Sequence, residues 1–304
     1  MSNYTRLASI LDALPDDGLL DALTAPTGRP GHGARVLWRA YVTFFVFNTT
    51  TISAGLRQIA DDPLLSEIVG GIPTKQAISR FLRKLKDHTD LLDACMAALV
   101  GSVREFLPDL GERVAVDSTD IKAWSSWRRS DPDAQSSVKT GTDGRPHWWY
   151  GFKAHVTCDT RYEIPLYAFV TPANKSDVQQ LPPGIEGVRA MGLNPTHVLA
   201  DAGYDSAANF TYVEGIDAIP IIKRKKLKNR PLPEPTKAWW AAYRARSGVE
   251  RMFGRAKDFR RLNRLTLKGV QKATVHCLVS LLTLLAFALA ALLLGFADDL
   301  RSCV

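Results

Sequence analysis

The feature of this sequence that most restricts its fold is a long apolar run near the C-terminal end. Residues 275–297 contain no formally charged side chain. A helix of that length can either span a bilayer or lie at the centre of a folded protein. Three polar residues interrupt the run and favour the buried helix, namely His276, Ser280 and Thr283. This segment alone leaves the membrane anchor as an alternative, although the N-terminal residues lack the apolar core of a signal peptide.

Composition and charge narrow the class of protein. The chain has 304 residues, of which 46% are hydrophobic and 23% are charged, as is typical of a folded globular protein. Its net charge of +8 favours a polyanionic partner, either a nucleic acid or an anionic membrane surface. The four cysteines are far apart and form no zinc-binding pattern, which indicates reduced thiols and a cytoplasmic protein.

The first 110 residues predict helices only, and we expect them to form a separate helical domain. The last of these helices covers residues 75–86, with Thr74 as its N-cap. A Gly-Gly pair precedes it, so a helix-turn-helix that binds DNA is one interpretation and a helical cap with a solvated basic face is the other. In the first interpretation three residues of this helix contact DNA, namely Arg80, Arg83 and Lys84.

The character of the chain changes at residue 111, where strands and helices begin to alternate. A long loop is expected over residues 122–147. The order of elements is three strands, helix, strand, helix, strand, helix, which predicts an α/β fold with a mixed sheet. This order matches the ribonuclease H-like fold, with a five-stranded sheet flanked by helices and a second domain over residues 111–304. We expect strands at residues 113–117, 149–158, 163–171, 196–201 and 217–222, and helices at residues 176–191, 206–213 and 237–262.

Three carboxylates stand out by their positions. Asp117 and Asp201 each end an apolar strand, and Glu250 lies in the long helix after the last strand. Singly, each is most simply a surface acid or a helix cap. Together at the carboxyl edge of a sheet they would repel one another unless cations intervened, and their hard oxygen atoms suit Mg²⁺ or Mn²⁺. Two such ions about 4 Å apart can activate a water or a 3′ hydroxyl and stabilise the leaving oxygen of a phosphodiester.

The helix around Glu250 has one face of unusual composition. Tyr243, Arg246, Glu250 and Lys257 fall within an arc of roughly 60° on an ideal helix. Arg246 is one turn from Glu250 and could simply pair with it. Lys257 lies two turns beyond Glu250, roughly 10 Å along the axis, which is too far to pair with it. A phosphate backbone that followed this face would contact Tyr243, Arg246 and Lys257.

The spacing Tyr-x2-Arg-x3-Glu-x6-Lys resembles the signature around the catalytic glutamate of a large group of bacterial insertion-sequence DDE transposases. Asp-x-Gly-Tyr at residues 201–204 and Val-Ala-Val-Asp-Ser-Thr at residues 114–119 resemble two further motifs of the group. Tyr-Gly-Phe-Lys-Ala-His at residues 150–155 and Thr-Pro-Ala-Asn-Lys-Ser-Asp at residues 171–177 also look like family segments. The resemblance extends from about residue 111 to residue 260.

The resemblance implies a function and a site. Asp117, Asp201 and Glu250 would be the catalytic, metal-binding triad, with two Mg²⁺ or Mn²⁺ ions. The enzyme would cleave DNA at the ends of its element and join the 3′ hydroxyls to target DNA. Its partners would be terminal inverted repeats, bound by residues 1–110, and target DNA. A homodimer or larger assembly is expected on DNA, because two ends must be paired.

Two further groups of basic residues are candidates for DNA contact. Lys153 and His155 lie on one face of the strand over residues 149–158, where an exposed strand face is the simpler alternative. Six of the eight residues from 223 to 230 are basic, in a proline-rich loop over residues 223–237 that would otherwise be merely solvated. The candidates in this loop are Lys223, Arg224, Lys225 and Lys226.

Three alternatives differ from an active transposase. A domesticated derivative would keep the fold and DNA binding without catalysis. A ribonuclease H-like nuclease would cleave without transposition, and a membrane protein would be anchored by residues 275–297. One departure from the family concerns residues 202–249, which are too few for the β-rich domain that better-known relatives insert between the second Asp and the Glu. A hairpin route of excision is therefore in question. For the transposase we expect a cytoplasmic, nucleoid-associated location.

Overall fold

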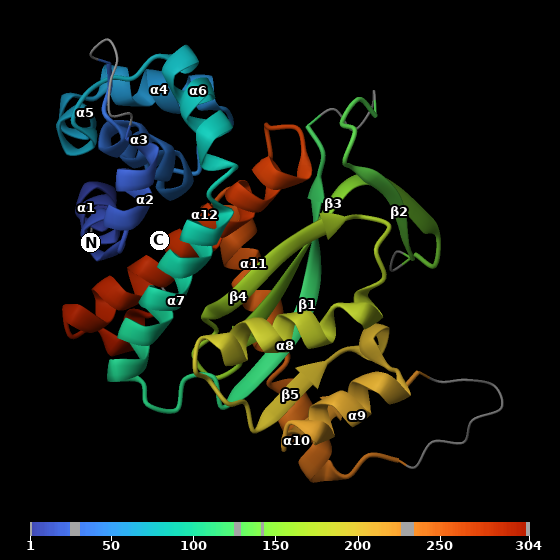
Figure 1. Cartoon of the computed structure of the whole chain (residues 1–304). Coiled ribbons are helices and arrows are strands. Elements are labelled where there is room, and N and C mark those ends of the chain that lie inside the picture. The colour runs from blue at the N-terminus through green and yellow to red at the C-terminus, as the bar shows by residue number, and fades with distance from the viewer. Residues whose placement is uncertain (1, 25–30, 125–128, 141–142, 226–233, 302–304) are drawn as a thin grey trace.

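A computed structural model of the protein describes residues 2–24, 31–124, 129–140, 143–225 and 234–301 (Figure 1). The N-terminal helices gather at one end of the molecule, and several begin at a polar cap. The side chains of Thr51, Asp62 and Thr74 each accept a hydrogen bond from an amide in the first turn of their helix. These helices are α1 (Asn3–Ala13), α2 (Asp17–Leu23), α3 (Ala34–Val46), α4 (Ile52–Asp61), α5 (Pro63–Val69), α6 (Lys75–Leu85) and α7 (Thr89–Phe106).

The described strands form one mixed sheet. Its order is β2-β3-β1-β5-β6, and β4 also pairs with β3. Strand β3 is antiparallel to β1, β2 and β4, whereas β5 is parallel to both β1 and β6. This mixed sheet fits the predicted ribonuclease H-like fold. The strands are β1 (Arg113–Lys122), β2 (Gln135–Thr140), β3 (Pro146–Asp159), β4 (Pro165–Pro172), β5 (His197–Ala200) and β6 (Ile219–Ile222).

The sheet has one strand more than the sequence predicts. Strand β2 lies in residues 122–147, which were expected to be a loop. Its residues are mostly polar and exposed, so they lack the apolar alternation that marks a half-buried strand. What fixes β2 is its antiparallel pairing with the first part of β3, from Gln135 opposite Gly151 to Thr140 opposite Pro146.

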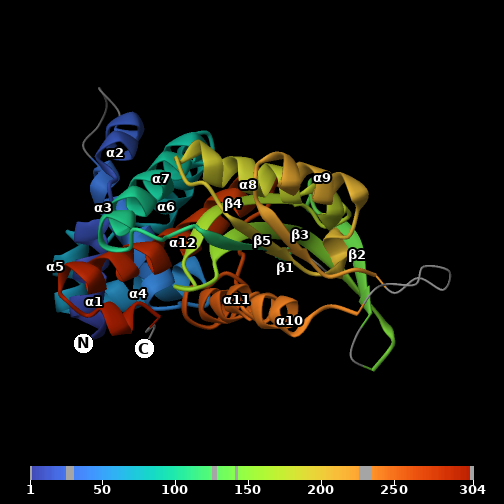
Figure 2. The same ribbon diagram turned by 90° about the horizontal axis from the view of Figure 1, so that it is seen from below.

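Helices cover both faces of the sheet (Figure 2). Helices α8 (Leu181–Ala190) and α9 (Ala207–Gly215) lie on one face, and α10 (Lys237–Arg244) and α11 (Ser247–Phe259) lie on the other. Three short 3-10 helices complete the described elements: η1 (Asp177–Gln179), η2 (Ala202–Tyr204) and η3 (Ala297–Asp299).

The prediction of one continuous helix over residues 237–262 is wrong. The chain tightens between α10 and α11, where the amide of Arg246 donates to the carbonyl of Tyr243, and that of Val249 to Arg246. Gly248 lies so close to the β3–β4 turn that a β-carbon would be 3.1 Å from the Thr160 carbonyl oxygen. The interruption places Glu250 in the first turn of α11, where the helix dipole favours an acid.

The apolar run forms most of α12 (Val270–Leu293), which lies at the centre of the protein. It packs against α7, β4, α1 and α3, and so joins the N-terminal helices to the sheet (Figure 1). The helix is long and apolar enough to cross a membrane, yet its most apolar 18-residue window is entirely buried inside the protein. The buried-helix interpretation therefore fits the structure. Burial lowers the pKa of His276 to about 3, so this side chain is neutral in the core.

Truncation of a buried leucine in α12 tests this position of the helix. Leu285 is fully buried, whereas Leu293 at the end of α12 is 61% exposed. Leu285→Ala is expected to lower the free energy of unfolding by about 2–5 kcal/mol, because it leaves a cavity in the core. Leu293→Ala is the matched control, with a change of roughly 0.5 kcal/mol or less. Urea denaturation followed by circular dichroism measures both, and equally small losses would contradict a core helix.

Candidate active site

The pairing of β1 with β5 brings two of the predicted acids together. Val116 of β1 lies opposite Ala200 of β5 in parallel register, so the next residues, Asp117 and Asp201, lie side by side. Neighbouring strands are about 4.8 Å apart. The prediction that Asp117 ends its strand is wrong, because pairing with β3 extends β1 to Lys122. Strand β5 ends at Ala200, one residue before the predicted end at Asp201. The Asp201 carboxylate caps η2 by accepting a hydrogen bond of 2.7 Å from the Gly203 amide.

The third acid reaches this point from the helical layer. The Arg246 guanidinium lies 3.0 Å from Oδ2 of Asp117 and also donates a hydrogen bond to Oε1 of Glu250. Arg246 thus bridges β1 and the first turn of α11. The Glu250 side chain is 55% exposed, whereas those of Asp117 and Arg246 are largely buried. The site is therefore open to solvent on the side of Glu250.

Burial has the largest effect on the electrostatics of Asp117. It raises the pKa of this carboxyl group, the charges of Asp201 and Glu250 add smaller increases, and the resulting pKa is about 6. The Ser118 amide and the Arg246 guanidinium oppose this pKa shift without cancelling it. A second positive charge near Asp117 would stabilise its ionised form.

The donor chemistry of these residues fits a divalent metal ion. Three carboxylates supply the hard oxygen atoms that Mg²⁺ and Mn²⁺ prefer. Within the described ranges, however, no three acidic, histidine or cysteine side chains are already arranged as ligands of one ion. Arg246 lies between Asp117 and Glu250 and satisfies both carboxylates. It contacts one oxygen of each, Oδ2 of Asp117 and Oε1 of Glu250.

The other residues of the predicted helix face stay near the carboxylates despite the break between α10 and α11. The Tyr243 ring stacks on Trp239, with centroids 5.0 Å apart, and the Arg246 guanidinium lies 5.7 Å from the Tyr243 ring centroid. Burial lowers the pKa of Lys257, while the charge of Asp120 on β1 raises it. The structure therefore gathers Tyr243, Arg246 and Lys257 on the side of the sheet where Glu250 lies.

Lys153 and His155 are not on an exposed strand face. Their residues are only 7% and 1% exposed, and both side chains turn toward Asp177. A direct contact with a DNA phosphate, as predicted for them, does not agree with this burial. Asp177 has no predicted role of its own and is only the last residue of the family segment at residues 171–177. The signal that could have singled it out is an acid after a polar turn that follows a buried strand.

The remaining candidates lie in two regions, the N-terminal helices and the segment after β6, where the Lys223 amide donates to the carbonyl of Ala200, the residue before Asp201. Arg80, Arg83 and Lys84 form an exposed basic face on α6, whose opposite face is buried. In the basic loop, Lys223 is exposed, but Arg224 pairs with Asp205 at 3.2 Å and stacks over the Phe210 ring. Lys226 and the rest of the basic run lie outside the described residues.

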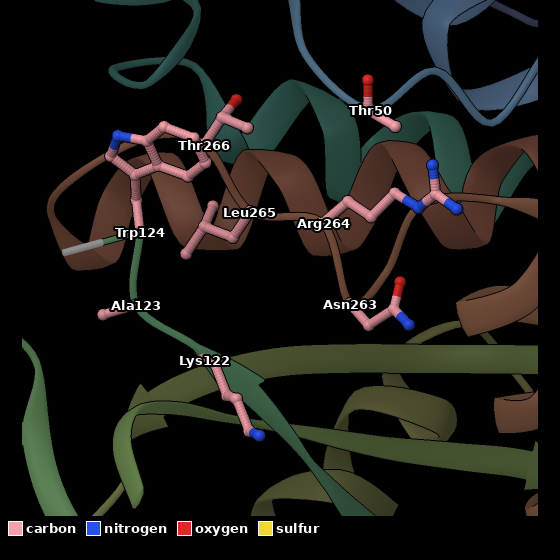
Figure 3. A pocket seen from close by; sticks show the side chains of 8 residues that line it. All are labelled: Thr50, Lys122, Ala123, Trp124, Asn263, Arg264, Leu265 and Thr266. Carbon is pink, nitrogen blue, oxygen red and sulfur yellow. The ribbon is translucent and has the colours of Figure 1, made fainter. Parts of the chain in front are cut away.

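A separate pocket lies beyond the end of β1 (Figure 3). It is formed where residues 122–124 approach the segment before α12 and Thr50 of the N-terminal region. Asp117, Asp201 and Glu250 do not line it. Its lining residues are Thr50, Lys122, Ala123, Trp124, Asn263, Arg264, Leu265 and Thr266.

Comparison with known proteins agrees with the fold. Residues 109–286 match the model of the transposase DDE domain. The chain therefore belongs to the transposase DDE domain family, whose members act on DNA and generally use divalent metal ions. It is also similar to the transposase for insertion sequence element IS1106 from Neisseria meningitidis serogroup B. The two are 28% identical over 262 residues, which cover 84% of each chain.

The raised pKa of Asp117 gives a stability prediction. The folded state binds the proton of the Asp117 carboxyl group more tightly than the unfolded chain does. The contribution of this group to the free energy of unfolding therefore falls as the pH rises from about 4 through 6. Asp117→Asn cannot ionise, so it is expected to stabilise the protein at pH 8 by at most about 3 kcal/mol. This gain should shrink toward pH 4. Thermal unfolding across this pH range measures it, with the exposed Glu214→Gln as the control, and a gain independent of pH would contradict the assignment.

Proposed function

We propose that the protein is the transposase of a bacterial insertion sequence, in the group with the Tyr-x2-Arg-x3-Glu-x6-Lys signature. It cleaves DNA at the ends of its element and transfers the 3′ hydroxyls to target DNA. The observation that carries the proposal is the convergence of Asp117 and Asp201 from adjacent parallel strands with Glu250, which Arg246 ties to Asp117. The family and the similarity to an insertion-sequence transposase support it.

In this function Asp117, Asp201 and Glu250 would hold two divalent metal ions. When bound, such ions would supply activation of the attacking water or 3′ hydroxyl and charge stabilisation of the leaving oxygen. Asp117 must be ionised to act as a ligand, and a bound cation would offset both the burial and the neighbouring acids that raise its pKa. The open side at Glu250 admits the scissile phosphate.

Arg246 exchanges partners in this mechanism. In the structure its single positive charge pairs with both Asp117 and Glu250 and offsets their charge in part. With cations bound to the carboxylates, its guanidinium would be available to pair with a DNA phosphate, for which its planar donors are well suited. Tyr243 and Lys257 flank it and contact the same backbone. These contacts orient the phosphodiester over the carboxylates.

Recognition of the element ends belongs to residues 1–110 in this proposal. Helix α6 follows α5 after a left-handed turn at Gly70, and its exposed face carries Arg80, Arg83 and Lys84. Lys223 and the basic loop add contacts to the phosphate backbone. Two copies of the protein pair the two ends of the element.

Substitution of the three acids tests the catalytic assignment. Asp117→Asn, Asp201→Asn and Glu250→Gln are each expected to reduce Mn²⁺-dependent nicking of a plasmid that carries the element ends by at least about 100-fold, because each removes a charged metal ligand. Glu214→Gln neutralises an exposed acid on α9 and should leave nicking unchanged.

Assays of strand joining and of end binding separate the transposase from its two alternatives, a nuclease and a domesticated derivative. Joining of a pre-cleaved 3′ end to a target plasmid distinguishes a transposase from a nuclease that only cleaves. A wild-type protein that binds the ends but never nicks them would instead be a domesticated derivative. Nicking that survives in Asp117→Asn would contradict the assignment of the acids.

The exposed face of α6 gives a salt-dependence prediction. Each phosphate contact contributes about 0.9 to the slope of log affinity against log salt concentration. The triple variant with alanine at Arg80, Arg83 and Lys84 should therefore lower the slope for end-containing DNA by roughly 2–3. Arg189→Ala removes an exposed arginine that pairs with Glu186 on α8 and should leave the slope unchanged. Fluorescence anisotropy measures both, and an unaltered slope in the triple variant would exclude α6 from the interface.

A further inference from the structure

A mostly buried polar network lies beside the three carboxylates and has no part in the mechanism above. At its centre is Asp177, the first residue of η1. The Lys153 ammonium donates to both carboxylate oxygens of Asp177, at 3.1 and 3.0 Å, and to the carbonyl of Lys175 at 2.9 Å. All three donor positions of this ammonium group are thus satisfied inside the protein.

Ser118 connects this ion pair to the candidate active site. Its hydroxyl donates to Oδ1 of Asp177 at 2.9 Å, and its backbone amide donates to Oδ1 of Asp117 at 2.8 Å. The other oxygen of Asp117, Oδ2, faces Arg246. Fixing Oδ1 against the backbone therefore sets the rotation of the Asp117 carboxylate and aims Oδ2 toward α11, where Glu250 lies.

Lys153 is the counter-ion of Asp177 in this network. His155 also approaches Asp177, with its Nδ1 3.9 Å from Oδ1, but burial lowers the pKa of this histidine to about 4. Its ring is therefore neutral near pH 7, and its Nε2 lies 2.9 Å from the Thr171 hydroxyl. Burial raises the pKa of the Tyr204 hydroxyl, and the nearby charges of Asp117 and Asp177 raise it further.

The energetics of such a pair indicate that it positions neighbouring groups rather than stabilises the fold. A buried ion pair often stabilises a fold no better than apolar residues of the same shape, because desolvation offsets the attraction. Its directional hydrogen bonds do, however, fix the groups that they reach. Beside a metal site, partners of this kind orient the ligands.

We propose that Asp177 and Lys153 are positioning residues that hold Ser118 and, through it, the Asp117 carboxylate in the orientation that binds metal. This inference rests on the proposed function. The pair is electrically neutral as a unit, so it fixes Asp117 without adding net charge to the three crowded acids. If the network acts through geometry, removal of either partner weakens metal binding. If it acts through charge, removal of Lys153 and removal of Asp177 have opposite effects on metal binding.

The test measures Mn²⁺ binding to the full-length protein by electron paramagnetic resonance, together with plasmid nicking and thermal unfolding. Lys153→Met, Asp177→Asn and Ser118→Ala are each expected to weaken Mn²⁺ affinity and nicking by about 10–100-fold. The double variant that combines Lys153→Met with Asp177→Asn should be no worse than either single variant, because the pair acts as a unit. Ser118→Thr keeps the hydroxyl donor and should restore near wild-type affinity.

An exposed ion pair supplies the matched control. Arg189 and Glu186 pair at 3.4 Å on the exposed side of α8. Arg189→Met and Glu186→Gln make the same kind of chemical change outside the network and should alter neither Mn²⁺ affinity nor nicking.

Three outcomes would overturn the inference. Folded variants with unchanged Mn²⁺ affinity would show that the network is only structural. Opposite effects of Lys153→Met and Asp177→Asn on Mn²⁺ affinity would show that the network acts through charge alone. Equal affinity of Ser118→Ala and Ser118→Thr would break the link to Asp117, and this comparison decides the question if the ion-pair variants fail to fold. A wild-type protein that neither binds Mn²⁺ nor nicks DNA would instead overturn the proposed function, and this inference with it.

Discussion

Burial of the Asp117 carboxylate is the constraint on which the candidate site depends. Adjacent parallel strands place Asp117 beside Asp201, and Glu250 adds a third acid from α11. Burial is the main reason that the pKa of Asp117 lies above its usual value, and the charges of Asp201 and Glu250 add to it. The Ser118 amide and the Arg246 guanidinium oppose this shift without cancelling it. A buried carboxylate with a raised pKa costs the fold stability when it is ionised, and a cation bound beside it would offset that cost.

The two oxygens of the Asp117 carboxylate are held from different layers of the fold. Oδ1 accepts a hydrogen bond from the backbone of β1, next to the Ser118 hydroxyl that reaches the network of Asp177. Oδ2 meets the guanidinium of Arg246 from the helical layer of α10 and α11. The first contact belongs to the sheet and is rigid. The second belongs to a long side chain that can change its partner, so one oxygen is fixed while the other can accept a new ligand.

Hydrophobic patterning was sufficient to predict five of the strands and the approach of Asp117 to Asp201, because alternating or continuous apolar residues mark the buried strands. Patterning could not reveal β2, whose polar residues are held by cross-strand pairing alone. The break before α11 depends on a close approach of Gly248 to a distant turn. The burial of Lys153 depends on Asp177, which is remote in sequence. Tertiary contacts decide these features, and a single sequence does not display them.

The position of α12 also has a consequence for how the protein is made. This helix packs against α1, although residues 14–269 separate the two along the chain. At 5–20 residues per second, roughly 10–50 s pass between synthesis of the first helix and of its partner. During that time the apolar surfaces of α1, α3 and α7 lack the helix that covers them. Burial of these surfaces therefore waits for a contact between the two ends of the chain, which is a long-range step late in synthesis.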